Sequence, residues 1–162
     1  MSTSYSGSYP IEHRTGEIER LQVQSEAMAP DALAMLERFG PMTGWTCLDI
    51  GCGPGGITDL LSDRVGPSGR VIGLDMDAAF LQHARSNAAP NVEFRLANAY
   101  DTDLPAGSFD LVHMRFVAST AGSPERLLGE AARLARPGGI VLIAAWLALV
   151  VAAIGALLHP AT

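Results

Sequence analysis

A cluster of glycines lies between two carboxylates in the first half of the chain. Asp49 precedes the run Gly51 to Gly56, and Asp75 follows it. A short apolar stretch enters the run and a helical pattern leaves it, which predicts a strand, a tight turn and a helix. Glycines allow positive φ angles and a close approach of backbone to a ligand, and the start of a helix offers unpaired N–H groups. The pattern therefore predicts a site for a nucleotide-like ligand.

The spacing of these glycines fits two ligand-binding motifs, and the first is the dinucleotide fingerprint. Gly51, Gly53 and Gly56 match G-x-G-x-x-G, the dinucleotide fingerprint, and Asp75 lies at the distance expected of a ribose-binding acid. A dinucleotide would bring a pyrophosphate to the helix N-terminus, where the Asp49 carboxylate would repel it. A glycine turn that binds nothing is the structural alternative.

Asp49 and the glycines also read D-x-G-x-G-x-G, which resembles motif I of the class I S-adenosylmethionine (SAM)-dependent methyltransferases. SAM carries a positive ammonium and a positive sulfonium but no phosphate, so the Asp49 carboxylate would attract it. The resemblance implies that Asp49 holds the ammonium directly or through water. It also implies that the backbone of the turn lies against the methionine part of SAM, at Gly51, Cys52, Gly53 and Gly55. SAM is therefore the predicted cofactor.

The same resemblance assigns the adenosine half of SAM to residues after the second and third predicted strands. Asp75 would accept hydrogen bonds from both ribose hydroxyls, with a helix cap as its alternative role. Met76 would pack on the adenine, or merely fill space. Asn98 and Ala99 stand where the family usually has an aspartate and an alanine, so Asn98 keeps an acceptor oxygen without the charge.

The segment LVHMRFV contains the end of the fourth predicted strand and places His113 and Arg115 after it. The family has this segment next to the transferring methyl group. His113 is the candidate catalytic base for a hydroxyl acceptor, and a structural role is its alternative. Arg115 is expected to bind an acidic substrate group or to pair with a surface carboxylate. Methyl transfer is an in-line displacement that gains mostly from positioning, and we expect no metal.

Short apolar strands that alternate with helices are predicted to position these residues. The strands are expected at 45–50, 71–74, 92–96 and 109–112 and from Ile140 onward. This alternation predicts an α/β fold, a doubly wound parallel sheet of about five strands, with ligands at the carboxyl ends of the strands. Motif I, Asp75, FDLV and LARPGG follow one another as in the Rossmann-like methyltransferase core.

Two amphipathic helices are predicted ahead of the first strand, as a helical cap over 16–40. The first spans 16–29, and the second begins at Pro30, which suits a first helical turn. The run E-R-L-x-x-Q at 19–24 resembles the N-terminal cap that folds over the cofactor in many small-molecule methyltransferases. A plain cover for the sheet is the alternative. Residues 1–15 are predicted to form a mobile arm.

Length and composition point to one domain, 1–162, with its core at 45–145. The net charge is −6 and no basic cluster occurs, so the electrostatic footprint of a nucleic-acid partner is missing. The N-terminus does not read as a signal or transit peptide. Cys47 and Cys52 are therefore expected to be reduced thiols, and the protein to be cytoplasmic.

The C-terminal part is unusual because no charged residue occurs from Ile140 to Leu158. We expect a fifth strand followed by an apolar tail, 146–162, that forms a hydrophobic helix on the sheet; a membrane span or attachment is the alternative. The family sheet has two further strands, so the chain resembles a shortened family member. The fifth strand would then be an exposed edge, which predicts self-association, weak cofactor binding and little turnover.

The sequence thus predicts a SAM-dependent methyltransferase that acts on a small-molecule acceptor. The alternatives are an NAD(P)-binding Rossmann domain, or a non-catalytic or membrane-attached module that kept the SAM-binding fold.

Overall fold

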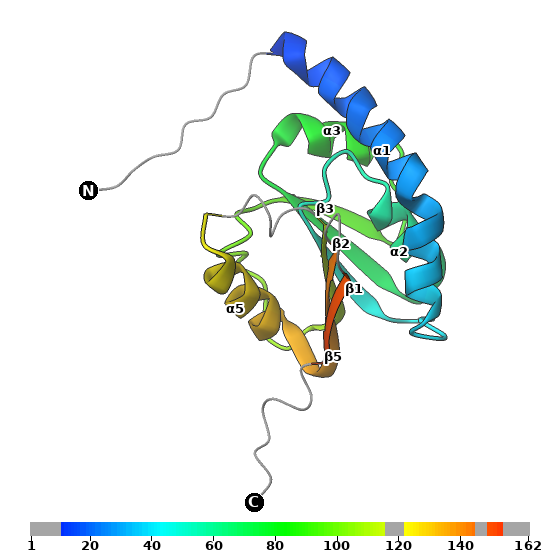
Figure 1. Ribbon diagram of the computed structural model, residues 1–162, viewed down its shortest axis with the longest axis vertical. Helices are drawn as coiled ribbons and strands as arrows, with labels where there is room; N and C mark the ends of the chain where they lie inside the picture. The colour runs from blue at the N-terminus through cyan, green and yellow to red at the C-terminus, as the bar shows by residue number, and fades with distance from the viewer. Residues whose placement is uncertain (1–10, 116–121, 145–148, 154–162) are drawn as a thin grey trace, which may run out of the picture.

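The computed structural model describes residues 11–115, 122–144 and 149–153, and side chains at 16–115 and 122–144. A six-stranded sheet runs through them in the order β3-β2-β1-β4-β5-β6 (Figure 1). The strands are β1 Thr46–Ile50, β2 Arg70–Asp75, β3 Val92–Leu96, β4 Phe109–Arg115, β5 Ala135–Ala144 and β6 Leu149–Ala153. The described helices are α1 Ile11–Glu37, α2 Ile57–Val65, α3 Ala78–Ser86 and α5 Pro124–Leu134.

The first five strands pair in parallel, with β1 between β2 and β4. The predicted doubly wound α/β fold is therefore confirmed. The chain moves outward from β1 to β3 and then crosses to β4 on the other side of β1. This reversal leaves a switch point beside the carboxyl end of β1, where open α/β sheets bind ligands. The glycine turn lies there because it directly follows β1.

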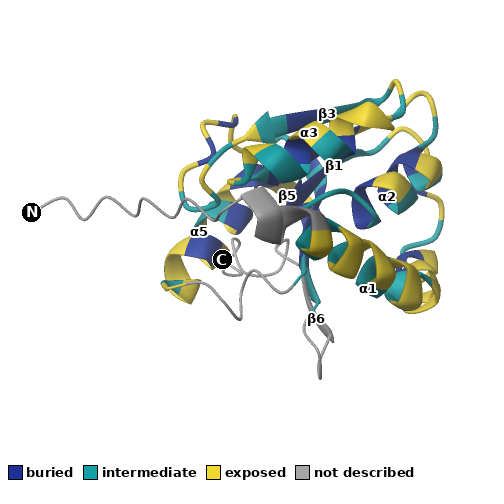
Figure 2. Ribbon diagram, turned by 90° about the horizontal axis from the view of Figure 1, so that it is seen from above, coloured by how far each residue is buried: buried dark blue, intermediate teal, exposed yellow. Residues whose placement is uncertain are grey.

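Helices cover both faces of the sheet (Figure 1). On one face, α1 and α2 pack on Cys47, Val71 and Leu111, and α3 packs on Phe94. On the other face, α5 packs on a core that includes Leu48. Neighbouring strand residues point to opposite faces, so strands covered on both sides are mostly apolar. Figure 2 shows exposed residues along the outer sides of the helices and buried segments in the interior, while the edge strand β3 is mostly of intermediate exposure.

The N-terminal cap is one continuous helix, not the two helices that the sequence predicts. α1 begins at Ile11, so the expected mobile arm does not extend to residue 15, and residues 1–10 lie outside the described part. Pro30 stands inside α1. Beyond it, Ala32 and Leu36 are buried against the sheet, whereas Leu33 is 37% exposed. Packing of this second half on the core holds the helix together across the proline.

The segment after β5 forms a strand, and the predicted hydrophobic helix is wrong there. β6 pairs antiparallel with β5 from Ala144↔Leu149 to Ile140↔Ala153. β5 is therefore not an exposed edge, contrary to the expectation from the sequence. Residues 145–148 and 154–162 of the predicted apolar tail lie outside the described residues. Within the described helices, none combines the length and the apolar character that crossing a bilayer requires.

Candidate functional site

The glycine turn after β1 is held against the neighbouring strand by its own backbone. The amides of Gly51 and Cys52 both donate to the carbonyl of Leu74, at 2.8 and 2.9 Å. The amide of Gly53 donates to Asp75 Oδ2 at 2.9 Å. Gly53 has a φ of +57°, and a Cβ there would meet no atom within 4 Å. The turn therefore presents bare backbone to open space, which is how a close approach to a ligand is prepared.

Gly56 is the last residue of the turn, and helix α1 packs directly against it. Its φ is +103°, and a Cβ on it would lie 2.0 Å from Ser25 Oγ. Ser25 in turn accepts a hydrogen bond from Arg115 Nη2 at 3.1 Å. Helix α1, the glycine turn and strand β4 thus meet at one serine. A glycine is required here for both reasons, the backbone angle and the close contact.

Asp75 ends β2 and faces the turn. Its Oδ2 accepts from Gly53 N, and its Oδ1 accepts from Asp77 N at 2.8 Å. Burial raises the pKa of Asp75 above its ordinary value, against the lowering effect of these backbone donors. The cap of α3 is Asp77, whose Oδ1 accepts from Ala79 N and Phe80 N. The alternative role of Asp75 as the helix cap is therefore wrong.

Asp49 and His113 lie inside their strands, not after them as the sequence suggests for His113. They are register partners on β1 and β4, and only 3% and 1% of their surfaces are exposed. Asp49 Oδ1 lies 2.8 Å from His113 Nδ1, and Asp49 Oδ2 accepts from Thr58 Oγ1 at 2.7 Å. β4 can continue through a histidine because Asp49 satisfies one of its ring nitrogens in the core.

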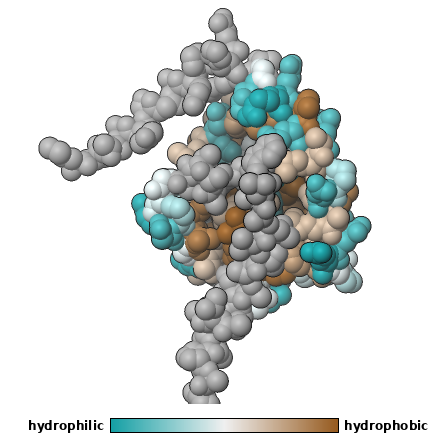
Figure 3. All heavy atoms as spheres, viewed as in Figure 1, coloured by the Kyte–Doolittle hydropathy of each residue, from teal (hydrophilic) through white to brown (hydrophobic). Residues whose placement is uncertain are grey.

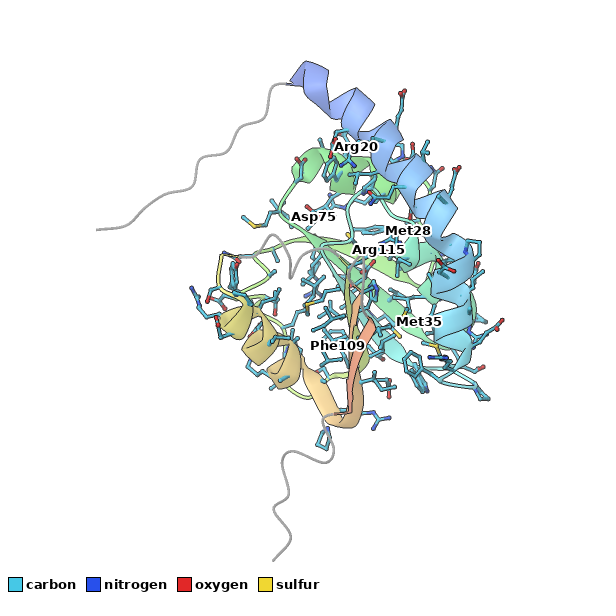
Figure 4. The ribbon with its side chains drawn as sticks, in the orientation of Figure 1. Arg20, Met28, Met35, Asp75, Phe109 and Arg115 are labelled. Carbon is cyan, nitrogen blue, oxygen red and sulfur yellow. The ribbon has the colours of Figure 1, made fainter. Side chains whose placement is uncertain are left out.

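Arg115 is the last residue of β4 and is half-buried beneath α1. Burial lowers the pKa of its guanidinium, and the nearby Asp49 carboxylate acts in the opposite direction. The guanidinium reaches Ser25 of α1. Figure 4 shows Arg115 and Asp75 toward the same, upper end of the sheet, whereas Phe109 lies near its lower end. The carboxyl ends of β2 and β4 thus face one region.

A cavity of about 290 Å³ occupies this region. Its floor is the glycine turn together with residues of β1, β2 and β4, and its roof is the N-terminal half of α1. The predicted residues that line it are Asp49, Gly51, Cys52, Gly53, Gly55, Asp75, His113 and Arg115. The remaining lining residues are Glu17, Leu21, Gln24, Pro54, Ile57 and Phe80. The structure thus brings together most of the residues that the sequence singles out.

Three predicted cofactor residues lie outside this cavity. Met76 is 68% exposed. Asn98 is exposed as well, and its side-chain oxygen accepts from Tyr100 N at 2.9 Å. Ala99 follows it in the same loop. All three follow β2 or β3 at the ligand-binding edge, so their contact with adenine stays a prediction.

Sequence reasoning misses the polar network beneath the cavity and part of its roof. In the sequence Thr58 stands two residues after the last glycine of the turn, and nothing in its type distinguishes it before Asp49 is seen beside it. Glu17 lines the cavity, although a charged residue on a helix gives no sign of this in the sequence. The run at 19–24 gives the one usable signal, because Leu21 and Gln24 do line the cavity.

A larger hollow of about 680 Å³ lies at the opposite, amino end of β2 and β3, beside Gly66, Arg70 and Asn91. It contains none of the predicted site residues. Hydrophilic residues gather at the upper end of the molecule, around the start of the described part of α1, whereas apolar atoms reach the surface in the middle of the view (Figure 3). Because the predicted site residues line the smaller cavity at the carboxyl ends of the strands, that cavity remains the candidate site.

The two cysteines are free thiols in the core. Burial raises the pKa of Cys47 to about 12, and it raises that of Cys52 as well. Both side chains are buried and form no disulfide. Cys52 therefore contributes its backbone, not a reactive sulfur, to the cavity.

Comparison with known proteins identifies relatives of this arrangement. The sequence profile described as "Methyltransferase domain" matches residues 48–143. The demethylmenaquinone methyltransferase of Lactococcus lactis is 38% identical over 111 residues, which are 66% of this chain and 44% of that protein. The chain spans less than half the length of the curated relatives it matches.

The solved structures that resemble this chain are methyltransferases as well. A SAM-dependent methyltransferase from Aquifex aeolicus superimposes with a TM-score of 0.72 at 28% identity, over 79% of this chain and 70% of that chain. A phosphoethanolamine N-methyltransferase of Haemonchus contortus in complex with SAM is 31% identical with a TM-score of 0.64. The alignment covers 70% of this chain and 27% of that one.

Proposed function

The chain belongs to the class I SAM-dependent methyltransferases, and from this we propose that it binds SAM beneath α1 and transfers the methyl group to a small-molecule acceptor. The observation that carries the proposal is the joint position of Asp75 and the glycine turn. The amide of Gly53 donates to the Asp75 carboxylate across one wall of the cavity. A ligand with a ribose and a chain that extends from it would contact both.

The charge of the cavity supports SAM over a dinucleotide. Asp49, Asp75 and Glu17 line it together with Arg115. Three carboxyl groups beside one guanidinium suit a ligand with an ammonium and a sulfonium, and they oppose a pyrophosphate. When bound, SAM supplies an electrophilic methyl group on its sulfonium. An NAD(P)-binding function is therefore the less favoured alternative.

The residues of this chain would bind and shield that ligand. Asp75 offers carboxylate lone pairs to the two hydroxyls of a ribose. Burial disfavours the charge of this carboxylate, and hydrogen bonds from the two hydroxyls would stabilise its ionised form. The glycine turn allows backbone contact with the rest of the ligand. Leu21 and Gln24 of α1 cover the cavity and would exclude water from it. Positioning of this kind can supply much of the catalysis of a displacement.

The acceptor is a small molecule in this proposal. Two of the relatives named above are a demethylmenaquinone methyltransferase and a phosphoethanolamine N-methyltransferase, so the family itself does not select an acceptor class for this chain. His113 as the catalytic base stays a prediction. Its burial means that an acceptor could reach it only through the cavity.

Two measurements test the proposal. Calorimetry should detect binding of SAM and S-adenosylhomocysteine and no binding of NAD or NADP. Incubation with SAM labelled in the methyl group should then transfer label to a member of a panel of small hydroxyl, amine and carbon acceptors. Binding of NAD without binding of SAM would refute the cofactor assignment. Binding of SAM with no transfer to any acceptor would favour the non-catalytic alternative.

A further inference from the structure

One ring nitrogen of His113, a residue that lines the cavity, has no hydrogen-bond partner among the described residues. His113 Nε2 is buried, and no described donor or acceptor reaches it. The residue itself is 1% exposed and lines the cavity. Buried polar atoms are nearly always paired, so each exception calls for an explanation. A ligand group that completes the pairing is one such explanation.

The surroundings of His113 define what kind of group that would be. Asp49 Oδ1 lies 2.8 Å from Nδ1, and a carboxylate can only accept, so Nδ1 carries the proton. In the neutral ring Nε2 then has a lone pair and accepts. Thr58 holds the second oxygen of Asp49 and fixes the orientation of the carboxylate. The unsatisfied atom thus requires a donor.

The position of His113 indicates which part of the cofactor supplies the donor. Asp75 lies on β2 and His113 on β4, on opposite sides of β1, and the cavity reaches both. If Asp75 binds the ribose, the amino-acid end of the ligand extends over the glycine turn toward β4. On the β5 side of His113 the register partner is Leu142, whose side chain offers no donor.

We propose that His113 Nε2 accepts a hydrogen bond from the ammonium of the cofactor, and that Asp49 acts as a positioning residue that holds His113 in the required tautomer. The inference rests on the proposed function and changes the expected role of both residues. Asp49 is only 3% exposed and its oxygens face Thr58 and His113, so in this proposal it acts on the ammonium through His113 and through its charge.

Two ligands test the contact. S-adenosylhomocysteine has the ammonium, whereas 5′-methylthioadenosine shares the adenosine and the thioether and has no amino-acid group. In calorimetry, His113→Phe should weaken S-adenosylhomocysteine about ten- to hundredfold and change the affinity for 5′-methylthioadenosine less than about twofold. His113→Gln keeps an acceptor oxygen and should recover part of the loss. As a control, Asp75→Asn should weaken both ligands, because both carry the ribose.

The outcomes separate the inference from the proposed function. An equal loss of both ligands in His113→Phe, or no loss of either, would overturn the inference while SAM binding stands. Unchanged affinity with a lower rate of methyl transfer would overturn it in favour of a catalytic base. If the wild-type protein binds neither ligand, the proposed function fails, and the inference fails with it.

Nuclear magnetic resonance tests the positioning role of Asp49 without any turnover. Long-range ¹H–¹⁵N correlations should show the proton of His113 on Nδ1 in the ligand-free protein, and the Nε2 signal should shift on addition of S-adenosylhomocysteine but not of 5′-methylthioadenosine. Asp49→Asn should alter the proton distribution on the ring and weaken S-adenosylhomocysteine selectively. Thr58→Val, which removes only the hydroxyl donor, should do the same to a smaller extent. A proton on Nε2 in the free wild-type protein would contradict the proposal.

Discussion

Asp75 and Asp77 are two residues apart and perform different tasks. Asp77 accepts from two amides at the start of α3, which is the work of a helix cap. Asp75 accepts from Gly53 N and Asp77 N and lies in the wall of the cavity. The residue types alone could not separate these tasks, because either aspartate suits either one.

The two aspartates therefore give a matched pair of variants. Asp75→Ala should weaken SAM by about 1.5–3 kcal/mol, the contribution of charge-assisted hydrogen bonds, and should also lower the free energy of unfolding, because Gly53 N and Asp77 N lose their acceptor. Asp77→Ala should lower the free energy of unfolding by about 1 kcal/mol through the lost cap but leave the affinity for SAM nearly unchanged. Calorimetry and urea unfolding of both variants measure the contrast. The assignment would be wrong if Asp75→Ala cost stability and kept its affinity.

At the scale of elements, the sequence identifies each parallel strand that the structure describes but places some boundaries wrongly. Pro30 predicts the start of a second helix, because proline lacks the N–H of an interior position. In the structure the loss of that one bond is tolerated, since Leu36 and Ala32 anchor the second half of α1 in the core. Local chemistry could not predict this because the compensation comes from tertiary packing.

The end of β4 shows the same limit. The polar residues His113 and Arg115 predict a strand that ends at Val112. The strand continues through Arg115 because β1 and β5 flank it and Asp49 satisfies His113 inside the sheet. The predicted residues are therefore right as a set lining the cavity, while the contacts between them could only be seen in three dimensions.

The junction of α1 with the glycine turn provides a prediction at this scale. Gly56→Ala should lower the free energy of unfolding by at least about 2 kcal/mol, because the new Cβ would meet Ser25 and the positive φ would be strained. Gly107→Ala is the control, since Gly107 has a φ of +64° and no neighbour within 4 Å of a Cβ. Its cost should be about 1 kcal/mol, from the backbone alone. Urea unfolding of both variants measures the difference.

A second substitution isolates the contact from the backbone strain. Ser25→Gly removes the oxygen that would lie 2.0 Å from a Cβ on Gly56. In the background of Gly56→Ala it should therefore be less damaging than in the wild-type protein. If the two substitutions simply add, Ser25 is not what confines Gly56.

At the scale of the whole molecule, the parallel core is predictable from the sequence and its far edge is not. Alternating strands and helices admit few arrangements once crossovers are right-handed, so the order of motifs is enough to place the site at the switch point. β6 lies in an apolar run without a turn signal or alternation. Its pairing depends on the open edge of β5, which is a non-local feature that periodicity does not report.

The pairing of β6 leads to the last prediction, which concerns association of the whole chain. In the structure β6 covers the backbone of β5 from Ile140 to Ala144, so removal of β6 should expose an apolar strand edge that pairs with other copies. A chain ending at Ala144 should therefore elute as larger, concentration-dependent species in size-exclusion chromatography with light scattering. A chain ending at Ala153 keeps the β5–β6 ladder and is the matched control, which should associate less. Equal association of the two chains would show that β6 does not protect the edge of β5. The self-association predicted from the sequence would then be expected of the full chain as well.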